Sequence, residues 1–165
     1  MQENHIYKIA AKYGGMNSGE ENGVRGYFLT YVIAYIRDFG ANHNFVAESF
    51  ETSCPWNKVS NLCANVRLRL IEASKRYGIP ANKVFGTSRV TQVYDTGAAV
   101  YTYFGLSYGD MPLNKVMEAY EAIECECRDE IIKNGGSISH HHGIGKTRKR
   151  FVKQTMSPLG IEMQH

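Results

Sequence analysis

The sequence predicts an α+β fold, in which long helices pack on one face of an antiparallel sheet. Residues 84–94 and 98–108 alternate in polarity on either side of Asp95-Thr96-Gly97, which is a typical hairpin turn signal. Long segments with helical spacing of apolar residues lie at 24–39, 56–77 and 112–133. No β-α-β unit with a glycine-rich nucleotide motif occurs, which argues against a parallel nucleotide-binding sheet.

Length and composition indicate one ordinary domain with a hydrophobic core. The chain has 165 residues, of which 43% are hydrophobic and 12% are aromatic, and this argues against disorder. A net charge of +3 is too small to indicate a polyanionic partner. No run of about 18 apolar residues occurs, so we expect no membrane-spanning helix. No internal repeat or linker suggests a domain boundary.

The first 40 residues contain two predicted helices. Residues 1–13 carry a small apolar stripe before two glycines end the helix. Residues 24–39 are apolar nearly all round, so we expect this helix to be covered on several sides. Arg37 lies in its last turn, where a cation in solvent complements the helix dipole. Alternatively, its guanidinium reaches a carboxylate or a phosphate.

The rest of the chain combines strands with amphipathic helices. Residues 45–52 read as a strand, and residues 56–77 read as a helix with a regular apolar stripe. After the hairpin, residues 112–133 form a third long helix with a similar stripe. We expect a final short helix to begin near Lys146, and residues 160–165 to complete no further element.

The second hairpin strand separates two kinds of side chain, because successive residues point to opposite faces of a sheet. One face carries Val100, Thr102, Phe104 and Leu106. The other face carries Tyr101, Tyr103, Gly105 and Ser107. Two phenols beside a glycine would leave room for a bound molecule, although tyrosine is also common on an ordinary sheet face.

Residues 137–150 hold the densest chemical signal in the chain. His140, His141 and His142 are consecutive, glycines follow at once, and residues 146–150 supply four cations. Consecutive histidines contribute little to a core, while glycines allow the backbone to approach another molecule closely. We interpret this segment as an active-site loop that places imidazoles and a cation around an anionic or proton-transferring substrate.

Three other interpretations of this loop are weaker. Only His140 and His142 could share a metal ion, because neighbouring side chains in an extended segment point to opposite faces. A phosphate-binding P-loop fails because His140 stands where its first glycine must be. The cations at 148–150 could bind nucleic acid, but one short cluster is usually a solvated helix end. We therefore expect neither a metal ion nor nucleic acid.

Several segments, in order, closely resemble the alkylglycerone-phosphate synthase family, also called the alkyl-dihydroxyacetonephosphate synthases. They are residues 7–15, 25–38, 48–52, 55–56, 89–95 and 134–146. The resemblance covers nearly the whole chain. It implies a flavoprotein of the vanillyl-alcohol-oxidase type, in which residues 1–165 would be a single partial domain. That domain would be the C-terminal FAD-linked oxidase or cap region, with ferredoxin-like elements.

The family's activity implies what the complete protein would do. Its members exchange the acyl group of acyl-dihydroxyacetone phosphate for a long-chain alcohol in ether lipid synthesis, with FAD as cofactor. The upstream FAD-binding domain is absent from this sequence, so we expect the isolated chain to be inactive. The resemblance also implies a peroxisomal location, possible peripheral membrane contact and a homodimer, although the chain carries no recognised targeting signal.

The resemblance also implies roles for individual residues. Arg37 looks like the arginine that grips the substrate phosphate, and Tyr101 like the tyrosine that exchanges a proton with the substrate carbon. His140, His141 and His142 look like the family's histidine run, which would orient that tyrosine or relay its proton. Arg89 and Tyr103 would line the same site, and an alignment error of two residues would exchange Tyr101 with Tyr103.

Two other functions stay open. An FAD-dependent oxidase of a hydroxy acid or phenol belongs to the same fold family but runs a different reaction. A non-catalytic chain that only binds phosphate or a partner subunit belongs to another class.

Overall fold

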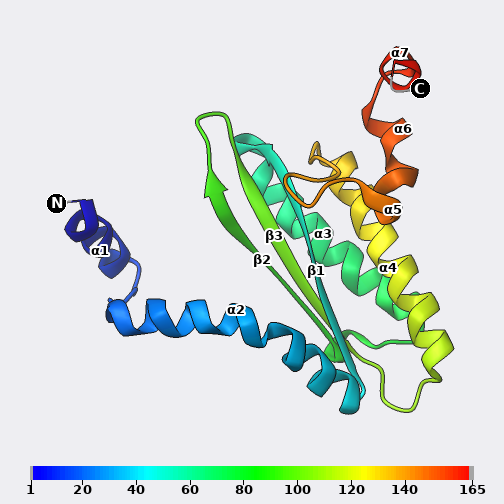
Figure 1. Ribbon diagram of the computed structural model, residues 1–165, viewed down its shortest axis with the longest axis horizontal. Helices are drawn as coiled ribbons and strands as arrows, with labels where there is room; N and C mark the ends of the chain where they lie inside the picture. Colours follow the sequence, from blue (N-terminus) through cyan, green and yellow to red (C-terminus); the bar gives the residue numbers. More distant parts are fainter. Residues whose placement is uncertain (1, 164–165) are drawn as a thin grey trace. The chain divides into compact units, whose positions relative to one another are not determined.

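The computed structural model describes residues 2–163, and the chain divides into two compact units between Phe39 and Gly40 (Figure 1). The first unit contains helix α1 (Gln2–Lys12) and most of helix α2 (Gly19–Asn42). Arg37 lies on α2 within this first unit. The geometry of the site below belongs to the second unit, so the role of Arg37 stays a prediction.

Helix α2 is exposed along its length, and the expectation that it is covered on several sides is wrong for this chain. None of its described residues is buried. Its exposed apolar side chains are Val24, Tyr27, Phe28, Leu29, Tyr31, Val32, Ile33, Tyr35, Ile36 and Phe39. Because these side chains surround the helix, covering them needs neighbours on several sides. The other helix described in its unit, α1, has only 11 residues.

The second unit is an antiparallel sheet with helices on one face, as predicted (Figure 1). Its strands are β1 (Phe45–Pro55), β2 (Val84–Val93) and β3 (Gly97–Ser107), in the order β1-β3-β2. The long helices are α3 (Trp56–Arg76) and α4 (Leu113–Lys133), and a short 3-10 helix, η1 (Ala81–Lys83), precedes β2. The α+β fold class is confirmed.

The core lies between the sheet and the helices α3 and α4. The predicted apolar stripes of both helices supply its centre, since these residues recur every three or four positions. The cluster consists of Phe50, Cys54, Leu62, Val66, Leu70, Ala73, Ile79, Val100, Phe104, Leu106, Ala119, Ile123, Cys127 and Ile131. Burying one such aliphatic or aromatic side chain stabilises the fold by about 1.5–3 kcal/mol.

Strand β3 has the two faces that its alternation predicts. Val100, Thr102, Phe104 and Leu106 are buried beneath the helices, whereas Tyr101 and Tyr103 are only partly buried on the opposite face. Gly105, however, leaves no room for a bound molecule. A Cβ at that position would lie 2.3 Å from Cζ of Phe45, whose ring fills the space from β1.

The C-terminal segment is a series of short turns of helix. They are α5 (Gly145–Arg148), η2 (Lys149–Phe151), α6 (Val152–Thr155) and α7 (Pro158–Glu162). Phe151 is fully buried and anchors the series. The prediction that no further element forms near the end is wrong, since α7 lies there. Ser157 caps this helix by accepting a hydrogen bond from Gly160 N (3.1 Å). Residues 164–165 lie outside the described part. Within residues 2–163, no helix has the length and apolarity to cross a membrane.

Candidate active site

The histidine loop, residues 137–144, passes around the edge of β1 from the helix-covered face to the open face of the sheet. Gly136 starts this path in a space where even a Cβ would crowd its neighbours. A Cβ there would lie 2.6 Å from Ile131 Cγ2 and 2.7 Å from Thr52 Oγ1. Ser137 then pairs with the edge strand, since its N–H donates to Ser53 O (2.9 Å) and its Oγ accepts from Ser53 N (3.0 Å).

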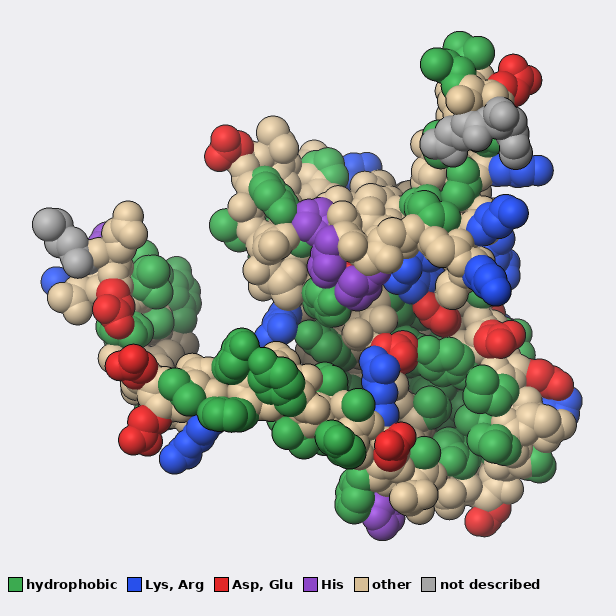
Figure 2. Space-filling model, viewed as in Figure 1, with side chains coloured by type: hydrophobic (Ala, Val, Ile, Leu, Met, Phe, Trp, Pro, Cys, Tyr) green, Lys and Arg blue, Asp and Glu red, His purple; other side chains and the backbone are tan. Residues whose placement is uncertain are grey.

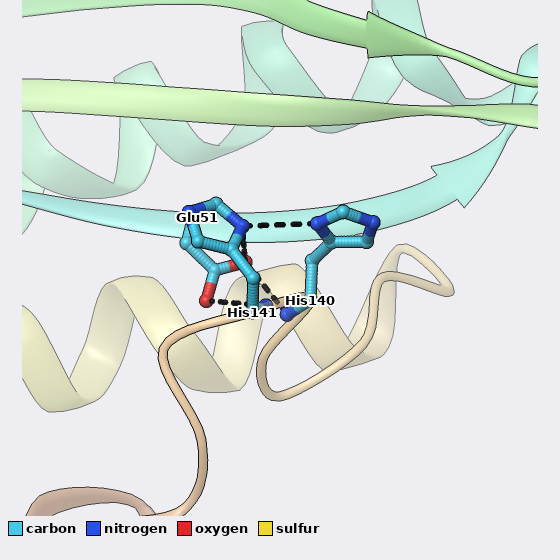
Figure 3. Close-up of side chains that lie close together, drawn as sticks. All are labelled: Glu51, His140 and His141. Atoms are coloured by element: carbon cyan, nitrogen blue, oxygen red, sulfur yellow. Dashed lines mark hydrogen bonds and ion pairs between the residues drawn. The ribbon is translucent and has the colours of Figure 1, made fainter.

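On the open face, the buried carboxylate of Glu51 holds the loop. Its side chain is fully buried, and it accepts hydrogen bonds from Ser139 Oγ and from the N–H of His140, both at 2.6 Å. The N–H groups of His142 and His141 donate to the same carboxylate at 3.1 and 3.4 Å. Consecutive N–H groups that converge on one anion form a concave anion-binding backbone. Figure 3 shows the carboxylate of Glu51 beside His141, with His140 next to them.

These bonds keep Glu51 ionised despite its burial. Burial is the largest single influence and by itself raises the pKa of a carboxyl group. The hydrogen bonds from Ser139 and from the backbone of the three histidines together outweigh it and lower the pKa of Glu51 to about 2. Glu51 is therefore a fixed negative charge at neutral pH.

Tyr101 faces the imidazoles of this loop. Its Oη lies 2.6 Å from Nε2 of His142 and 3.3 Å from Nε2 of His141. The rings of both histidines lie within 5.6 Å of the tyrosine ring, centroid to centroid. The three histidines gather on one face of the molecule (Figure 2). Tyr101 and His142 thus form a hydrogen-bonded pair, in which the tautomer of His142 decides which group donates.

Electrostatics keeps both members of this pair neutral at neutral pH. Burial raises the pKa of Tyr101, and the charges of Tyr103 and Glu51 raise it further. Burial lowers the pKa of His142, although the negative charge of Glu51 partly opposes this shift. A neutral phenol that donates to a neutral imidazole can move a proton from oxygen to nitrogen and back.

A hydrogen-bonded row continues from these residues to the end of β2. Nδ1 of His140 lies 2.9 Å from Nδ1 of His141. Nε2 of His140 lies 2.9 Å from Oη of Tyr94, whose hydroxyl donates to Gln92 Oε1 (2.8 Å). Glu51, Ser139, Tyr94 and Gln92 were not among the predicted site residues. All four lie inside segments of the family resemblance, at 48–52, 89–95 and 134–146, but the resemblance implied no role for them.

Arg89 and Tyr103 lie beside the pair on the same face of the sheet. Arg89 is the cross-strand partner of Tyr101, and its Nη2 donates to Tyr103 Oη (3.1 Å). The rings of Tyr101 and Tyr103 are stacked with centroids 5.5 Å apart. Of these two tyrosines, Tyr101 alone contacts the histidines among the described contacts. Which of the two carries the proton role stays a prediction.

Arg148 is not fully exposed to solvent, although the cluster of cations at 148–150 suggested a solvated helix end. It is half-buried, and its Nη1 donates to Gly143 O (2.8 Å), which closes the loop. Its buried Nε–H has no acceptor among residues 2–163. Burial lowers the pKa of Arg148, while Glu51 and Tyr101 are among the charges that raise it. Arg148 therefore adds a positive charge near the pair.

The assumption that the histidine loop is extended, which allowed only His140 and His142 to share a metal ion, is wrong. The loop bends at each histidine instead of running extended, and ligand atoms of Glu51, His140 and His141 lie within 4.8 Å of one another. A metal ion would have to compete for atoms already in use. Glu51 accepts four hydrogen bonds, and the Nδ1 atoms of His140 and His141 bond to each other. The arrangement suits proton handling, and the expectation of no metal stays a prediction.

A cavity of about 280 Å³ lies elsewhere, between α3 and the sheet. It is lined by Cys63, Ala64, Arg67, Leu70, Gly86, Thr87, Ser88 and Thr102. Thr102 points to the helix-covered face of β3, opposite Tyr101, so this cavity is separate from the candidate site.

Comparison with known proteins assigns the chain to a class. The family of FAD linked oxidases, C-terminal domain, matches residues 7–165. The chain therefore belongs to the FAD-linked oxidase family and corresponds to its C-terminal domain.

Within that class, the chain is similar to proteins named alkyldihydroxyacetonephosphate synthase, which confirms the resemblance predicted from its motifs. It is 48% identical to the Caenorhabditis elegans protein over 161 residues, which cover 98% of this chain and 26% of the relative. It is 29% identical to the Dictyostelium discoideum protein over 140 residues, which cover 85% of this chain and 22% of the relative. The chain thus spans about a quarter of the length of these curated relatives.

Solved structures agree with the sequence comparison. A structure of alkyldihydroxyacetonephosphate synthase in crystal form P212121 matches with a TM-score of 0.56 and 27% identity, covering 79% of this chain and 22% of that one. A second structure, in form P1, matches with a TM-score of 0.51 and 25% identity, covering 65% and 18%.

Proposed function

We propose that this chain is the substrate-binding and proton-handling part of an FAD-dependent alkyl transferase of the alkyldihydroxyacetonephosphate synthase type. The complete protein would exchange the acyl group of acyl-dihydroxyacetone phosphate for a long-chain fatty alcohol. The observation that carries this proposal is the 2.6 Å contact between Tyr101 Oη and His142 Nε2, at the tyrosine and the histidine run that the family motifs align.

In this proposal, Tyr101 and His142 move one proton between them and the substrate. Transfer of the phenolic proton from Oη to Nε2 of His142 leaves a phenolate that can take a proton from the substrate carbon. The reverse transfers return that proton to carbon and restore the neutral pair, so the reaction consumes no net proton. Because both groups are neutral at rest, neither step begins from a buried unpaired charge.

FAD fits the open face on which this pair lies. The rings of Tyr101 and Tyr103 are partly exposed there, so aromatic and hydroxyl groups are available to contact a planar ring system. When bound, the flavin supplies the reactive ring that allows the substituent on the substrate carbon to be exchanged. We assign most of the cofactor's binding residues to sequence upstream of the matched domain.

The remaining partners follow the same proposal. Arg37 would bind the substrate phosphate, because a guanidinium can donate two parallel hydrogen bonds to phosphate oxygens. The complete protein would act as a peroxisomal homodimer with peripheral membrane contact. Arg89 would keep Tyr103 at the edge of the site through its bond to that hydroxyl.

A chimaeric enzyme tests this function directly. Residues 1–165 would replace the matching segment of the Caenorhabditis elegans synthase, to which this chain is 48% identical. We expect a flavin-loaded protein that incorporates radiolabelled hexadecanol into alkyl-dihydroxyacetone phosphate and consumes no oxygen. A correctly folded, flavin-loaded chimaera without this incorporation would contradict the proposal.

An oxidase is the second candidate, because the matched family is named for FAD linked oxidases. An oxidase of a hydroxy acid or phenol would cycle through fully reduced flavin in stopped-flow spectra and would consume oxygen. A chain that only binds phosphate would instead bind dihydroxyacetone phosphate in a titration, lose that binding on Arg37→Ala, and show neither reaction in the chimaera.

A further inference from the structure

We propose that Glu51 is a positioning residue of this site. It holds His140, His141 and His142 by their backbone N–H groups, and its charge keeps the proton of His142 on Nδ1 so that Nε2 faces Tyr101 with its lone pair. This inference rests on the proposed function, because it assigns to Glu51 the task of preparing the proton acceptor that the transfer requires.

The first step of the argument is geometrical. Glu51 lies on β1 directly opposite Tyr101 on β3, so its carboxylate and the phenol project from the same face of the sheet. The backbone of the three histidines converges on that carboxylate at 2.6–3.4 Å. A loop held by its backbone leaves its side chains free for other contacts, and here the imidazoles of His141 and His142 reach Tyr101.

The second step follows the protons along the loop. Tyr94 donates its only hydroxyl proton to Gln92, so Nε2 of His140 must be the donor to Tyr94 Oη. Nδ1 of a neutral His140 is then an acceptor, and its partner is Nδ1 of His141. His141 therefore carries its proton on Nδ1, the nitrogen that lies 3.8 Å from Glu51 Oε2.

The third step concerns the proton acceptor itself. Nδ1 of His142 lies 3.7 Å from Glu51 Oε1, whereas its Nε2 lies 2.6 Å from Tyr101 Oη. A negative charge beside Nδ1 favours the proton on that nitrogen and leaves Nε2 able to accept the phenolic proton. A distance of 3.7 Å is too long for a hydrogen bond, so Glu51 acts on His142 through its charge.

The surrounding charges make Glu51 the group suited to this task. Arg148 and Arg128 are positive groups that act on His142, together with the neighbouring His141, and all three disfavour its charged form. Glu51 opposes them. Removing this carboxylate would leave Arg148 and Arg128 as the charged groups that act on the imidazole and would take away the acceptor of the loop's backbone.

Nuclear magnetic resonance of the 165-residue chain with ¹⁵N-labelled histidine tests this inference, because two-bond ¹H–¹⁵N couplings distinguish an Nδ1–H from an Nε2–H imidazole. We expect His142 in the unsubstituted chain to be the Nδ1–H tautomer. In Glu51→Gln, the Nε2–H form should appear, and the backbone N–H of His140 should exchange with solvent at least tenfold faster. Glu51→Asp keeps the charge and should restore part of the Nδ1–H signal.

Glu48→Gln is the matched control. It makes the same chemical change on the same strand, but Glu48 is three residues from Glu51, so its side chain points to the opposite face of the sheet. It should leave the His142 tautomer unchanged. A folded Glu51→Gln chain with an unaltered His142 signal would overturn the inference. If Glu51→Gln does not fold, the unsubstituted chain still decides, because an Nε2–H tautomer of its His142 would also refute it.

These measurements need neither flavin nor substrate, so they fail or succeed separately from the proposed function. An inactive chimaera with an Nδ1–H His142 would refute the transferase proposal and leave the positioning of the imidazole intact. An active chimaera with an Nε2–H His142 would support the transferase proposal and refute the positioning of the imidazole by Glu51.

Discussion

Glu51 and Tyr101 are direct partners in the antiparallel register of β1 and β3, and the histidine loop contacts both of them. The buried carboxylate of Glu51 accepts hydrogen bonds from the loop's backbone, and the phenol of Tyr101 contacts its imidazoles. Arg89 is the partner of Tyr101 on the other side. Three neighbouring strands thus place an anion, a phenol and a cation in one row, beside which the loop folds.

Tyr101→Phe should remove transfer activity from the chimaeric enzyme while leaving its fold and flavin content unchanged. The ring keeps its packing, but the oxygen that gives and takes the proton is lost. We expect the rate of alcohol incorporation to fall by about 100-fold or more, the usual contribution of a positioned acid or base. Circular dichroism and the flavin absorbance at equal protein concentration would confirm the intact fold.

Tyr103→Phe is the matched comparison for that experiment. Tyr103 stacks on Tyr101 and accepts a hydrogen bond from Arg89, but no described contact links it to the histidines. We expect its loss to lower the rate by less than about tenfold. A greater loss in Tyr103→Phe than in Tyr101→Phe would show that the proton role belongs to the other tyrosine.

The strands and long helices could be predicted to within a few residues because their signals are local. The hairpin at Asp95-Thr96-Gly97 and the alternation along β3 report directly on which side chains face the core. Coverage of α2 was not predictable in the same way, since its composition is that of a buried helix while its described side chains are exposed.

The candidate site could be predicted from the sequence only in part. Tyr101 and the histidines could be singled out because the family resemblance implies roles for them, but it implied none for Glu51. Three of its four partners are backbone N–H groups 89 to 91 positions later in the chain, and a bond to backbone leaves no side-chain pattern to read. The bends at His140–His142 were also missed, and an extended loop was assumed when the metal site was weighed.

Cys127 should resist thiol reagents in the folded chain. Its side chain is fully buried beside the sheet, and burial raises the pKa of its thiol to about 12. Almost no thiolate exists at pH 8, and only the thiolate attacks iodoacetamide at a useful rate. Mass spectrometry should find Cys127 labelled only after unfolding, with partly exposed Cys125 labelled earlier. Equal labelling rates in the native chain would contradict this packing.

Gly136→Ala should destabilise the second unit and loosen the histidine loop. The added Cβ would meet Ile131, Thr52 and Leu62 within 2.9 Å, and two of these residues belong to the core. Overpacking of this kind costs about 1–3 kcal/mol. Urea denaturation would measure that loss.

Gly26→Ala is the control for the previous substitution, because nothing lies within 4 Å of a Cβ at that position on α2. Alanine is a better helix former than glycine by up to about 1 kcal/mol, so this variant should be no less stable than the unsubstituted chain. An unchanged urea midpoint for Gly136→Ala would show that the loop can leave β1 without cost.

Glu51 should make the stability of the chain depend on pH in the acid range. Its pKa is about 2 in the folded chain, against an ordinary value of 4.5. Since the folded pKa is the lower one, the unfolded chain binds the proton first as the pH falls. The stabilisation from the ionised carboxylate is therefore complete above about pH 5, declines below pH 4.5 and is lost near pH 2. Its full size is about 3 kcal/mol.

Glu51→Gln removes this titration, so the difference in unfolding free energy between the two chains should itself depend on pH. We expect that difference to shrink by about 2 kcal/mol between pH 6 and pH 3, because most of the folded chain is still ionised at pH 3 whereas the unfolded chain is not. Urea denaturation at both pH values measures it, and Glu48→Gln provides the background for a glutamate on the same strand. A difference that stays constant from pH 6 to pH 3 would mean that the loop does not hold Glu51 as an anion.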